Sequence, residues 1–428
     1  MSFKDWQSAS LEEVCFFGSD KIVIEKVSLN NYISTENMLP DKGGITIASG
    51  LPTTKTVSKF EKSDILISNI RPYFKKIWFA TKSGGCSNDV LIFKNKVNGR
   101  LDNKYLYYNL KKDDFFNFMT ASAKGTKMPR GDKDAIMKYK INLPSLEEQK
   151  SIASILSSLD EKIETNNQIN NKLEEMAQAI FKQWFVDFEF PNEDGEPYKS
   201  SDGEMVESEL GSIPKGWELT TFRSFTRNVL GGDWGKENEQ GNYQMAVNCL
   251  RGADIPEVSE GRIGSLPKRY ILEKNYNNKK LNSGDLVVEI SGGSPTQSTG
   301  RITYINDLML NKYDQDFVCT NFCRAITLKD PMYMYYFYFY WKMLYDLNVF
   351  FQYENGTTGI KNFDINTFLD KFLIISPGKE LIKRFDKVVK PLVDRIQMNG
   401  SENLKIAEIR DTLLPKLMSG EIRVPIES

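Results

Sequence analysis

Two stretches that lie far apart in the chain carry the same helical pattern of apolar positions. From Pro144 to Trp184 apolar residues recur at alternating steps of four and three, behind a serine and two glutamates that are typical of a helix start. A shift of 233, the separation of Pro144 from Pro377, gives a second stretch with the same pattern. The matched seams are Ile152, Leu156, Leu159, Ile163, Asn166, Asn170, Leu173, Ala177, Ile180 and Trp184, and Phe385, Val389, Leu392, Ile396, Asn399, Asn403, Ile406, Arg410, Leu413 and Leu417.

Asparagines interrupt both seams at matching places, and Arg410 is the one further break in the second seam. An amphipathic helix explains the apolar positions but not the repeated polar pair. Buried asparagines help to fix the register of coiled coils. We therefore expect the two long helices to be partners in a coiled coil, the alternative being two unrelated core helices that share a period.

The sequence before each long helix also repeats, more loosely. Matching segments predict a strand entered from a turn, a helix capped by an aspartate, and a polar glycine loop before the last strand. The matched segments are Ser63–Ser68 with Gly284–Glu289, Cys86–Asn88 with Cys319–Asn321, Asp102–Tyr108 with Asp330–Tyr336, and Gly125–Lys127 with Gly356–Thr358. Each half of the chain is therefore expected to be one mixed domain followed by one long helix.

These patterns predict an α+β protein. Two α/β-type domains in a pseudo-twofold arrangement are separated by two long antiparallel coiled-coil helices. The predicted parts are domain 1 (1–144), a central helix (145–186), a linker rich in acids, Gly, Pro and Ser (187–213), domain 2 (214–376) and a C-terminal helix (377–420). Helices of about 40 residues span on the order of 60 Å. Proteins with such symmetry commonly contact two half-sites on DNA.

Composition excludes several classes of enzyme. The chain has 428 residues, of which 40% are hydrophobic and 26% charged, as in ordinary globular proteins of two to four domains. It has no histidine, which excludes Ser-His-Asp catalysis and His-ligated zinc. The net charge of −1 gives no overall attraction to nucleic acid, although local basic loops suffice for binding.

The cysteines and the apolar runs favour the cytoplasm. The five scattered cysteines form no C-x-x-C pair and are typical of reduced thiols. The start of the chain lacks the apolar core of a signal peptide, and the run Met332–Trp341 is too short to span a bilayer. We therefore expect a cytoplasmic protein with no membrane partner.

Three stretches around the central helix resemble the specificity subunit of type I restriction–modification systems. They are Leu143-Pro144-Ser145-Leu146-Glu147-Glu148-Gln149-Lys150-Ser151-Ile152-Ala153, Gln183-Trp184-Phe185-Val186-Asp187-Phe188, and Glu209-Leu210-Gly211-Ser212-Ile213-Pro214-Lys215-Gly216-Trp217. The resemblance implies two target-recognition domains that each read one half of a bipartite site in double-stranded DNA. It also implies that the long helices set the spacing and dock two methyltransferase subunits, and that restriction (translocase) subunits complete a DNA-cleaving complex.

The residues themselves indicate a non-catalytic subunit. The chain has no G-x-x-x-x-G-K-[ST] phosphate loop. Asp330-Pro331-Met332-Tyr333 lacks the second proline of a methyltransferase turn, and Glu148-Gln149-Lys150 lies in the first turns of a helix, where an acid stabilises the helix start. We expect no catalytic residue, no metal site and no cofactor in this chain. The resemblance implies that S-adenosylmethionine, ATP and Mg²⁺ belong to partner subunits.

Two polar and basic stretches of the first domain are candidates for DNA contact. Reading a sequence requires donors that reach base edges, while cations and backbone amides hold phosphates. One stretch directly follows a predicted strand, and the other lies in the glycine loop. Arg71 and Arg130 are candidates for guanine and Lys75, Lys76 and Lys127 for phosphate, with Asn69, Lys124 and Thr126 as further members.

The matching stretches of the second domain offer a similar set. Gln297 is a candidate for adenine and Arg301 for guanine or phosphate. The other candidates are Ser294, Thr296, Thr357, Thr358, Lys361 and Asn362, together with the stretch 231–236. The alternative for each of these residues is a solvated loop that keeps the domain soluble.

The aromatic run Tyr333–Trp341 has two interpretations. It is either a platform on which bases stack or a helix packed against its own sheet, and the aromatic segment at the matching place of the first half favours the packed helix. For the whole chain, the alternatives to a DNA-specificity subunit are an adaptor whose coiled coil joins partners without reading DNA, and an enzyme that uses carboxylates. No spacing of acids supports the enzyme.

Overall fold

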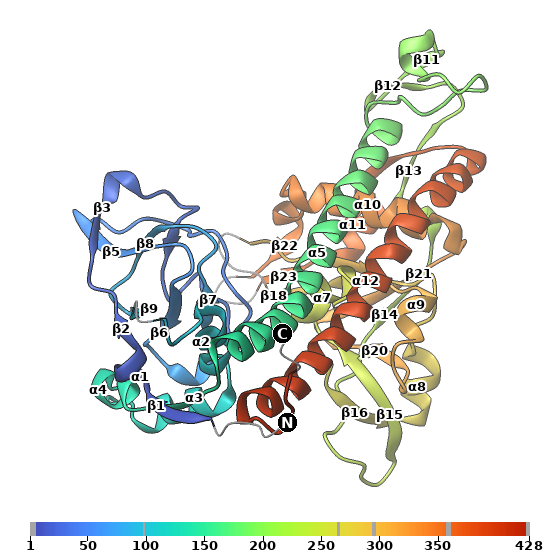
Figure 1. Ribbon diagram of the computed structural model, residues 1–428. Coiled ribbons are helices and arrows are strands. Elements are labelled where there is room, and N and C mark those ends of the chain that lie inside the picture. Colours follow the sequence, from blue (N-terminus) through green and yellow to red (C-terminus); the bar gives the residue numbers. More distant parts are fainter. Residues whose placement is uncertain (1–5, 97–98, 263–265, 293–296, 357–360, 425–428) are drawn as a thin grey trace. The chain divides into compact units, whose positions relative to one another are not determined.

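A computed structural model describes residues 6–424 except 97–98, 263–265, 293–296 and 357–360 (Figure 1). The chain divides into two compact units, Met1–Lys162 with Ile406–Ser428, and Ile163–Lys405. Both cuts fall inside the long helices. Each unit therefore contains one mixed domain and part of both helices, and the five-part division made from the sequence stays a prediction.

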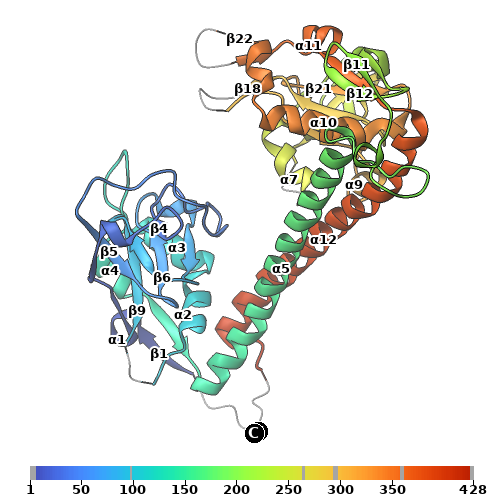
Figure 2. The same cartoon turned by 90° about the horizontal axis from the view of Figure 1, so that it is seen from above.

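The two long helices are α5 (Leu146–Phe185) and α12 (Lys379–Ser419). The Ser145 hydroxyl accepts a hydrogen bond from the Glu148 amide at 3.2 Å, so the serine caps α5 as its position predicts. Figure 1 and Figure 2 show α5 and α12 side by side. They run antiparallel in both units. In the first unit Glu148 pairs with Arg423 and Asp160 with Arg410, and in the second Asn166 pairs with Asn403 and Asn170 with Asn399.

The residues of the predicted seam are all buried or half-buried. Asn166 Nδ2 donates to Asn403 Oδ1 at 2.8 Å, and Asn399 Nδ2 donates to Asn170 Oδ1 at 2.8 Å. The shift of 233 exchanges these two pairs with one another, so the polar contacts follow the repeat of the sequence.

Arg410 breaks the apolar seam because it takes part in a polar cluster of the first unit. Asp160 of α5 accepts from Arg410 Nη1 at 2.6 Å, from Lys111 Nζ at 2.9 Å and from the Tyr108 hydroxyl at 2.8 Å. Tyr108 belongs to α2 (Asn103–Leu110), and Lys111 directly follows it. One carboxylate thus joins the first domain to both long helices.

The described residues of the domain before α5 form ten strands and four α-helices. Two four-stranded sheets have the orders β2-β9-β6-β7 and β3-β5-β8-β4, and β1 pairs with β10. The strands are β1 (Gln7–Ser10), β2 (Cys15–Phe17), β3 (Lys21–Val23), β4 (Tyr32–Ile33), β5 (Thr56–Phe60), β6 (Ile65–Ser68), β7 (Ile77–Phe79), β8 (Gly84–Cys86), β9 (Val90–Asn95) and β10 (Lys140–Leu143). The helices besides α2 are α1 (Leu11–Val14), α3 (Asp113–Ala121) and α4 (Lys133–Met137).

The domain between α5 and α12 repeats the main features of this topology. The antiparallel sheet β14-β21-β17-β19 matches β2-β9-β6-β7, and β13 pairs with β24 as β1 pairs with β10. A parallel strand pair also recurs, β15 with β20 in place of β4 with β8. The predicted duplication of the domain is therefore confirmed.

The elements of the second domain have the following bounds. Its strands are β13 (Glu218–Thr221), β14 (Thr226–Gly231), β15 (Tyr243–Leu250), β16 (Lys268–Leu272), β17 (Leu286–Glu289), β18 (Ser291–Gly292), β19 (Ile302–Tyr304), β20 (Phe317–Cys319), β21 (Cys323–Leu328), β22 (Glu354–Asn355), β23 (Lys361–Phe363) and β24 (Leu373–Ser376). Its helices are α6 (Phe222–Phe225), α7 (Ile255–Ser259), α8 (Glu273–Lys279), α9 (Asp307–Leu310), α10 (Met334–Asp346) and α11 (Ile365–Lys371).

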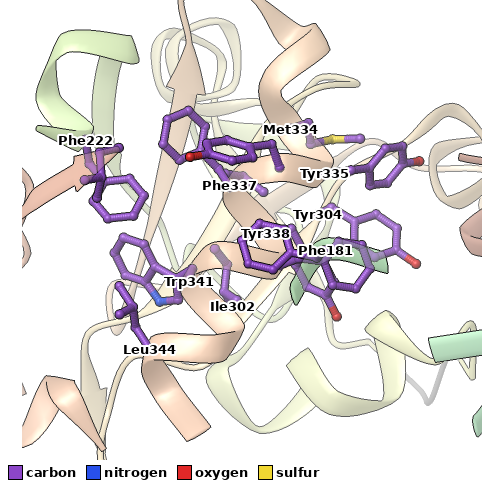
Figure 3. Close-up of a cluster of buried hydrophobic side chains, with 14 of the residues drawn as sticks. Phe181, Phe222, Ile302, Tyr304, Met334, Tyr335, Phe337, Tyr338, Trp341 and Leu344 are labelled. Carbon is purple, nitrogen blue, oxygen red and sulfur yellow. The ribbon is translucent and has the colours of Figure 1, made fainter. Parts of the chain in front are cut away.

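The aromatic run forms a packed helix, as the second interpretation predicts. Most side chains of α10 are buried on the sheet β14-β21-β17-β19. Figure 3 shows Tyr338 and Trp341 of α10 in a cluster that also contains Phe181 of α5 and Phe222 of α6. The end of α5 is thus part of the core of the second domain, and Ile152 and Leu156 near its start belong to the core of the first.

The predicted linker 187–213 contains folded structure. Its last residues form a hairpin of β11 (Met205–Ser208) and β12 (Gly211–Pro214). Phe190 is buried, with ring centroids 4.5 Å from Tyr198 and 5.3 Å from Trp217. This stacking anchors the segment to the second unit, so the segment is folded structure and not only the linker that its composition predicts.

Candidate nucleic-acid interface

The structure brings together the two predicted basic stretches of the first domain. The chain leaves the buried strand β6 at Ser68 and turns, while residues 124–131 fold back beside it. The Arg71 amide donates to the Pro129 carbonyl at 2.8 Å, and Ile70 forms a β-bridge with Arg130. Side chains that are about 60 positions apart in the sequence therefore share one edge of the domain.

Several predicted side chains at this edge face solvent. Thr126 and Lys127 are exposed, as is Lys124, which forms an ion pair with Asp132. Arg130 Nε donates to Asp89 Oδ1 at 3.1 Å, and this pair is half-exposed. An arginine held by a carboxylate in this way keeps its other N–H groups available to an acceptor.

Three other predicted residues are turned inward or paired within the protein. Asn69 is only 6% exposed, and its buried Oδ1 has no hydrogen-bond partner in the described part of the chain. Lys75 pairs with Asp113 at 2.9 Å. Lys76 Nζ donates to the Thr35 carbonyl at 2.6 Å, and burial lowers the pKa of this lysine. None of these three polar groups points freely into solvent. The outer face of the edge therefore consists mainly of Lys124, Thr126, Lys127 and Arg130, with Arg71 half-buried beside them.

In the second domain the corresponding edge surrounds β18 and β23. Ser291 pairs with Asn362 across this ladder, which places Lys361 and Asn362 beside the end of β17. Lys361 forms an ion pair with Glu354 at 2.9 Å, Asn362 is exposed, and Gln297 Nε2 donates to the Tyr345 hydroxyl at 3.4 Å. Ser294, Thr296, Thr357 and Thr358 lie outside the described residues.

Arg301 is held more firmly than the other candidates. Its Nε donates to Glu289 Oε2 at 2.7 Å and its Nη2 to Glu289 Oε1 at 2.6 Å. Glu289 is 4% exposed, while Arg301 is half-buried. Such a bidentate pair fixes the plane of the guanidinium and leaves its Nη1 edge for another acceptor.

A cavity of about 510 Å³ lies in front of this pair and adds residues that sequence reasoning missed. Phe322 at its rim is 61% exposed, and Arg269 stacks on Trp234, another rim residue, at 3.8 Å from the ring centroid. Its other lining residues include Arg251 and Asn321. The sequence pointed to Trp234 through the stretch 231–236 and to Asn321 through the repeat, but nothing in it distinguished Phe322 from a core aromatic residue.

The acidic side chains and cysteines of the described part of the chain bear on two other chemistries, metal binding and thiol reactivity. No group of three or more Cys, Asp or Glu side chains there is placed to hold a metal ion. All five cysteines are buried, and burial raises the pKa of Cys15 and Cys249 to about 12, which disfavours the reactive thiolate. Among these residues, no helix is long and apolar enough to cross a membrane.

Comparisons of the sequence confirm the resemblance. Residues 3–175 match the family described as "Type I restriction modification DNA specificity domain". The Type I restriction enzyme HindI specificity subunit of Haemophilus influenzae is 26% identical over 98% of this chain and 100% of its own length. The Type I restriction enzyme MjaIX specificity subunit of Methanocaldococcus jannaschii is 28% identical over 75% of this chain and 69% of its own length.

A comparison of structures agrees at the level of the fold. The crystal structure of the type I restriction–modification S subunit from M. genitalium has a TM-score of 0.57 and 16% sequence identity to this chain. The similarity covers 98% of this chain and 97% of that one. The α+β fold with two domains and two long packed helices is therefore the fold of a known S subunit.

Proposed function

We propose, from the relationship of this chain to the specificity subunits of type I restriction–modification systems, that it selects the DNA sequence on which such a complex acts. Each domain would read one half of a bipartite target in double-stranded DNA. The observation that carries this proposal is the duplication: both domains present polar and basic side chains where the matched strands β6 and β17 end. Two copies of one reading edge suit a target in two parts.

In this proposal the long helices set the spacer between the half-sites and dock two methyltransferase subunits. The cores support the first role, because Ile152 of α5 is buried in the first domain and Phe181 of the same helix in the second. Movement of a domain along the helix would break that packing. The polar pairs of the seam oppose sliding of α5 along α12, since a shifted register would leave buried amides without partners.

The chain acts without catalytic groups or cofactors of its own. This part of the proposal is supported by the comparisons reported above, which name specificity subunits and no catalytic family. S-adenosylmethionine, ATP and Mg²⁺ would be bound by the methyltransferase and restriction (translocase) subunits. The site of action is the cytoplasm, where the DNA and these partners are found, and no membrane takes part.

Methylome sequencing of cells with and without this chain tests the proposal. The modification subunit of the same system is present in both strains. We expect one bipartite motif to be methylated only when the chain is present. Methylation that is unchanged by its removal would contradict the proposal.

An electrophoretic mobility shift assay of DNA with this chain and the co-purified modification subunit distinguishes a specificity subunit from an adaptor. If the chain is a specificity subunit, the complex binds DNA that contains the motif found by methylome sequencing more tightly than DNA of scrambled sequence. Equal binding of both, or no binding, favours an adaptor.

A further inference from the structure

The edge where β6 ends and the edge where β17 ends share one set of backbone hydrogen bonds. Three bonds recur between matching positions, with similar lengths in the two domains. They are Ser68 N to Lys76 O (3.1 Å) and Glu289 N to Arg301 O (2.9 Å), Asn69 N to Asp89 O (2.8 Å) and Ile290 N to Phe322 O (2.8 Å), and Gly131 N to Asn69 O (3.2 Å) and Phe363 N to Ile290 O (2.8 Å). We call each set of three bonds a backbone frame.

The backbone turns of the two edges differ in detail. The third residue after Ser68 is Arg71, with a φ of 48°, and the third after Glu289 is Gly292, with a φ of 144°. Both residues have a positive φ, but the two values are different backbone conformations, so the match of the two edges rests on the hydrogen bonds and not on a common turn type. The β-bridge of Ile70 to Arg130 corresponds to that of Ser291 to Asn362.

The side chains on this shared frame differ in chemical class. Serine is replaced by glutamate, aspartate by phenylalanine, and arginine by asparagine, whereas one cation remains a cation. The matched positions are Ser68 and Glu289, Asp89 and Phe322, Arg130 and Asn362, and Lys76 and Arg301. In contrast, the strands that lead into the two frames, Ile65–Ile67 and Leu286–Val288, are apolar and buried in both domains.

This contrast separates packing from recognition. A position that serves the core keeps its class, because burial demands an apolar side chain. A position that reads DNA changes its class when the base to be read changes. The frame therefore supplies a constant backbone with exchangeable side chains.

In the first domain the frame presents charged groups. Asp89 lies in the turn between β8 and β9 and holds Arg130 through the 3.1 Å bond to its Nε. Both side chains are exposed by about a third or more, Asp89 at 35% and Arg130 at 49%. A guanidinium fixed in this way can donate to guanine O6 and N7 in the major groove.

In the second domain the frame presents an aromatic ring beside a buried ion pair. Phe322 occupies the place of Asp89, in the turn between β20 and β21, and is 61% exposed. The backbone encloses Glu289, since a Cβ on Gly252 or Gly292 would lie 2.6 or 2.9 Å from its Oε1. This fit, together with its two bonds to Arg301, makes Glu289 a positioning residue for that guanidinium.

We propose that Asp89 with Arg130 in the first domain, and Phe322 with Arg301 in the second, are the residues that determine which bases each domain reads. The inference rests on the proposed function and makes it specific. The first domain reads a guanine through Arg130. The second reads a guanine through Arg301 and, beside it, a thymine through contact of Phe322 with the C5-methyl group.

Methylome sequencing of cells with the full chain and its modification subunits tests this assignment. Phe322→Ala relaxes the motif at one thymine of one half-site and leaves the other half unchanged. Asp89→Ala relaxes one position of the opposite half-site. The matched control is Leu347→Ala, which removes an apolar side chain of the second unit that is 65% exposed but lies outside the frame. We expect this control to leave the methylated motif unchanged. Thermal unfolding of the three variants checks that each one folds as the parent does.

A binding titration tests the methyl contact directly. Replacing that thymine by deoxyuridine removes its methyl group and weakens binding of the parent complex by about 10-fold, within the range for one altered base pair. Phe322→Ala binds both DNAs equally, because the side chain that senses the methyl group is gone. An equal loss in parent and variant would overturn the thymine contact.

The outcomes separate this inference from the proposed function. If the parent chain directs no motif, the proposed function fails. If the parent directs a bipartite motif that Phe322→Ala and Asp89→Ala leave intact, or if both variants alter the same half-site, the proposed function stands and the assignment of reading residues is overturned.

Discussion

Asp160 lies on α5 and accepts hydrogen bonds from Tyr108, Lys111 and Arg410. Burial by itself raises the pKa of a carboxyl group, but here the charges of Lys111 and Arg410 outweigh it and lower the pKa of Asp160 below its ordinary value. Lys111 is 5% exposed, so its charge depends on this carboxylate. The cluster is therefore costly to break from one side.

Asp160→Asn should destabilise the first unit by about 3–5 kcal/mol at neutral pH, because it leaves a buried lysine uncompensated. Denaturant unfolding measures this. The neighbouring Glu161→Gln is the control, since its exposed ion pair with Lys104 is expected to contribute less than about 1 kcal/mol.

The pH dependence of Asp160→Asn follows from the lowered pKa of Asp160. The stabilisation by the carboxylate is complete above its unfolded pKa of about 3.9 and is lost as the pH falls through the lower folded pKa. The gap between parent and variant should therefore close in acid. A gap that stays constant down to the lowest pH would contradict the ion-pair explanation.

The buried Lys312 of the second unit should make the free energy of unfolding depend on pH in the alkaline range. Its Nζ donates to the backbone carbonyl and the side-chain oxygen of Gln397, both at 2.8 Å, and burial lowers its pKa to about 8. Between pH 8 and about 10.5 the unfolded chain keeps a proton that the folded chain has lost, so stability rises with pH. In Lys312→Met the free energy of unfolding should rise by about 2 kcal/mol less over this pH range than in the parent. Unfolding curves of both proteins at pH 7.5 and 10 measure the difference.

At the residue scale, the sequence selected the two stretches that share the edge at the end of β6, but it did not predict the contacts of each side chain there. It selected the stretches that contain Arg71 and Arg130, because a polar break after a strand is visible in the pattern. It did not predict that Lys75 pairs with Asp113, or that Lys76 donates to the Thr35 carbonyl. Those partners are distant in the sequence, and only the fold brings them close.

At the scale of elements, the long helices are the best-predicted part of the molecule. The predicted range 145–186 compares with Leu146–Phe185 for α5, and 377–420 with Lys379–Ser419 for α12. Seam period, capping serine and flanking prolines all agree there. The hairpin β11–β12 was not predicted, because its anchor is the stacking of Phe190 on Tyr198 and Trp217, which leaves no periodic signal.

Asn399→Leu should destabilise the second unit by about 1–3 kcal/mol, because Asn170 Oδ1 loses its donor in a buried place. The double variant Asn170→Leu with Asn399→Leu should recover part of that loss, since two apolar side chains then face one another. A double-mutant cycle of unfolding free energies measures the coupling. Asn171→Leu, at an exposed neighbouring position, is the control and should change stability by less than about 0.5 kcal/mol. Additive effects of the two substitutions would contradict a direct bond between the asparagines.

At the scale of the whole molecule, the repeat of the sequence is also a repeat of the fold. The shift of 233 exchanges the two asparagine pairs of the seam. The matched sheets of the two domains carry the two backbone frames. Duplication was visible in the sequence because packing conserves apolar periods. The candidate reading side chains were less visible, because those positions carry different residue types in the two halves, as Asp89 and Phe322 do.

The central claim is that each domain reads its own half-site while α5 and α12 set the spacer, and a heptad insertion tests it most directly. Seven residues are added between Lys162 and Ile163 of α5, and seven between Lys405 and Ile406 of α12, where the two compact units divide. Seven residues lengthen a helix by about 10 Å, or roughly 3 base pairs of duplex. Methylome sequencing should show both half-sites unchanged and a spacer longer by about 3 base pairs. Altered half-sites, or an unchanged spacer, would contradict the account.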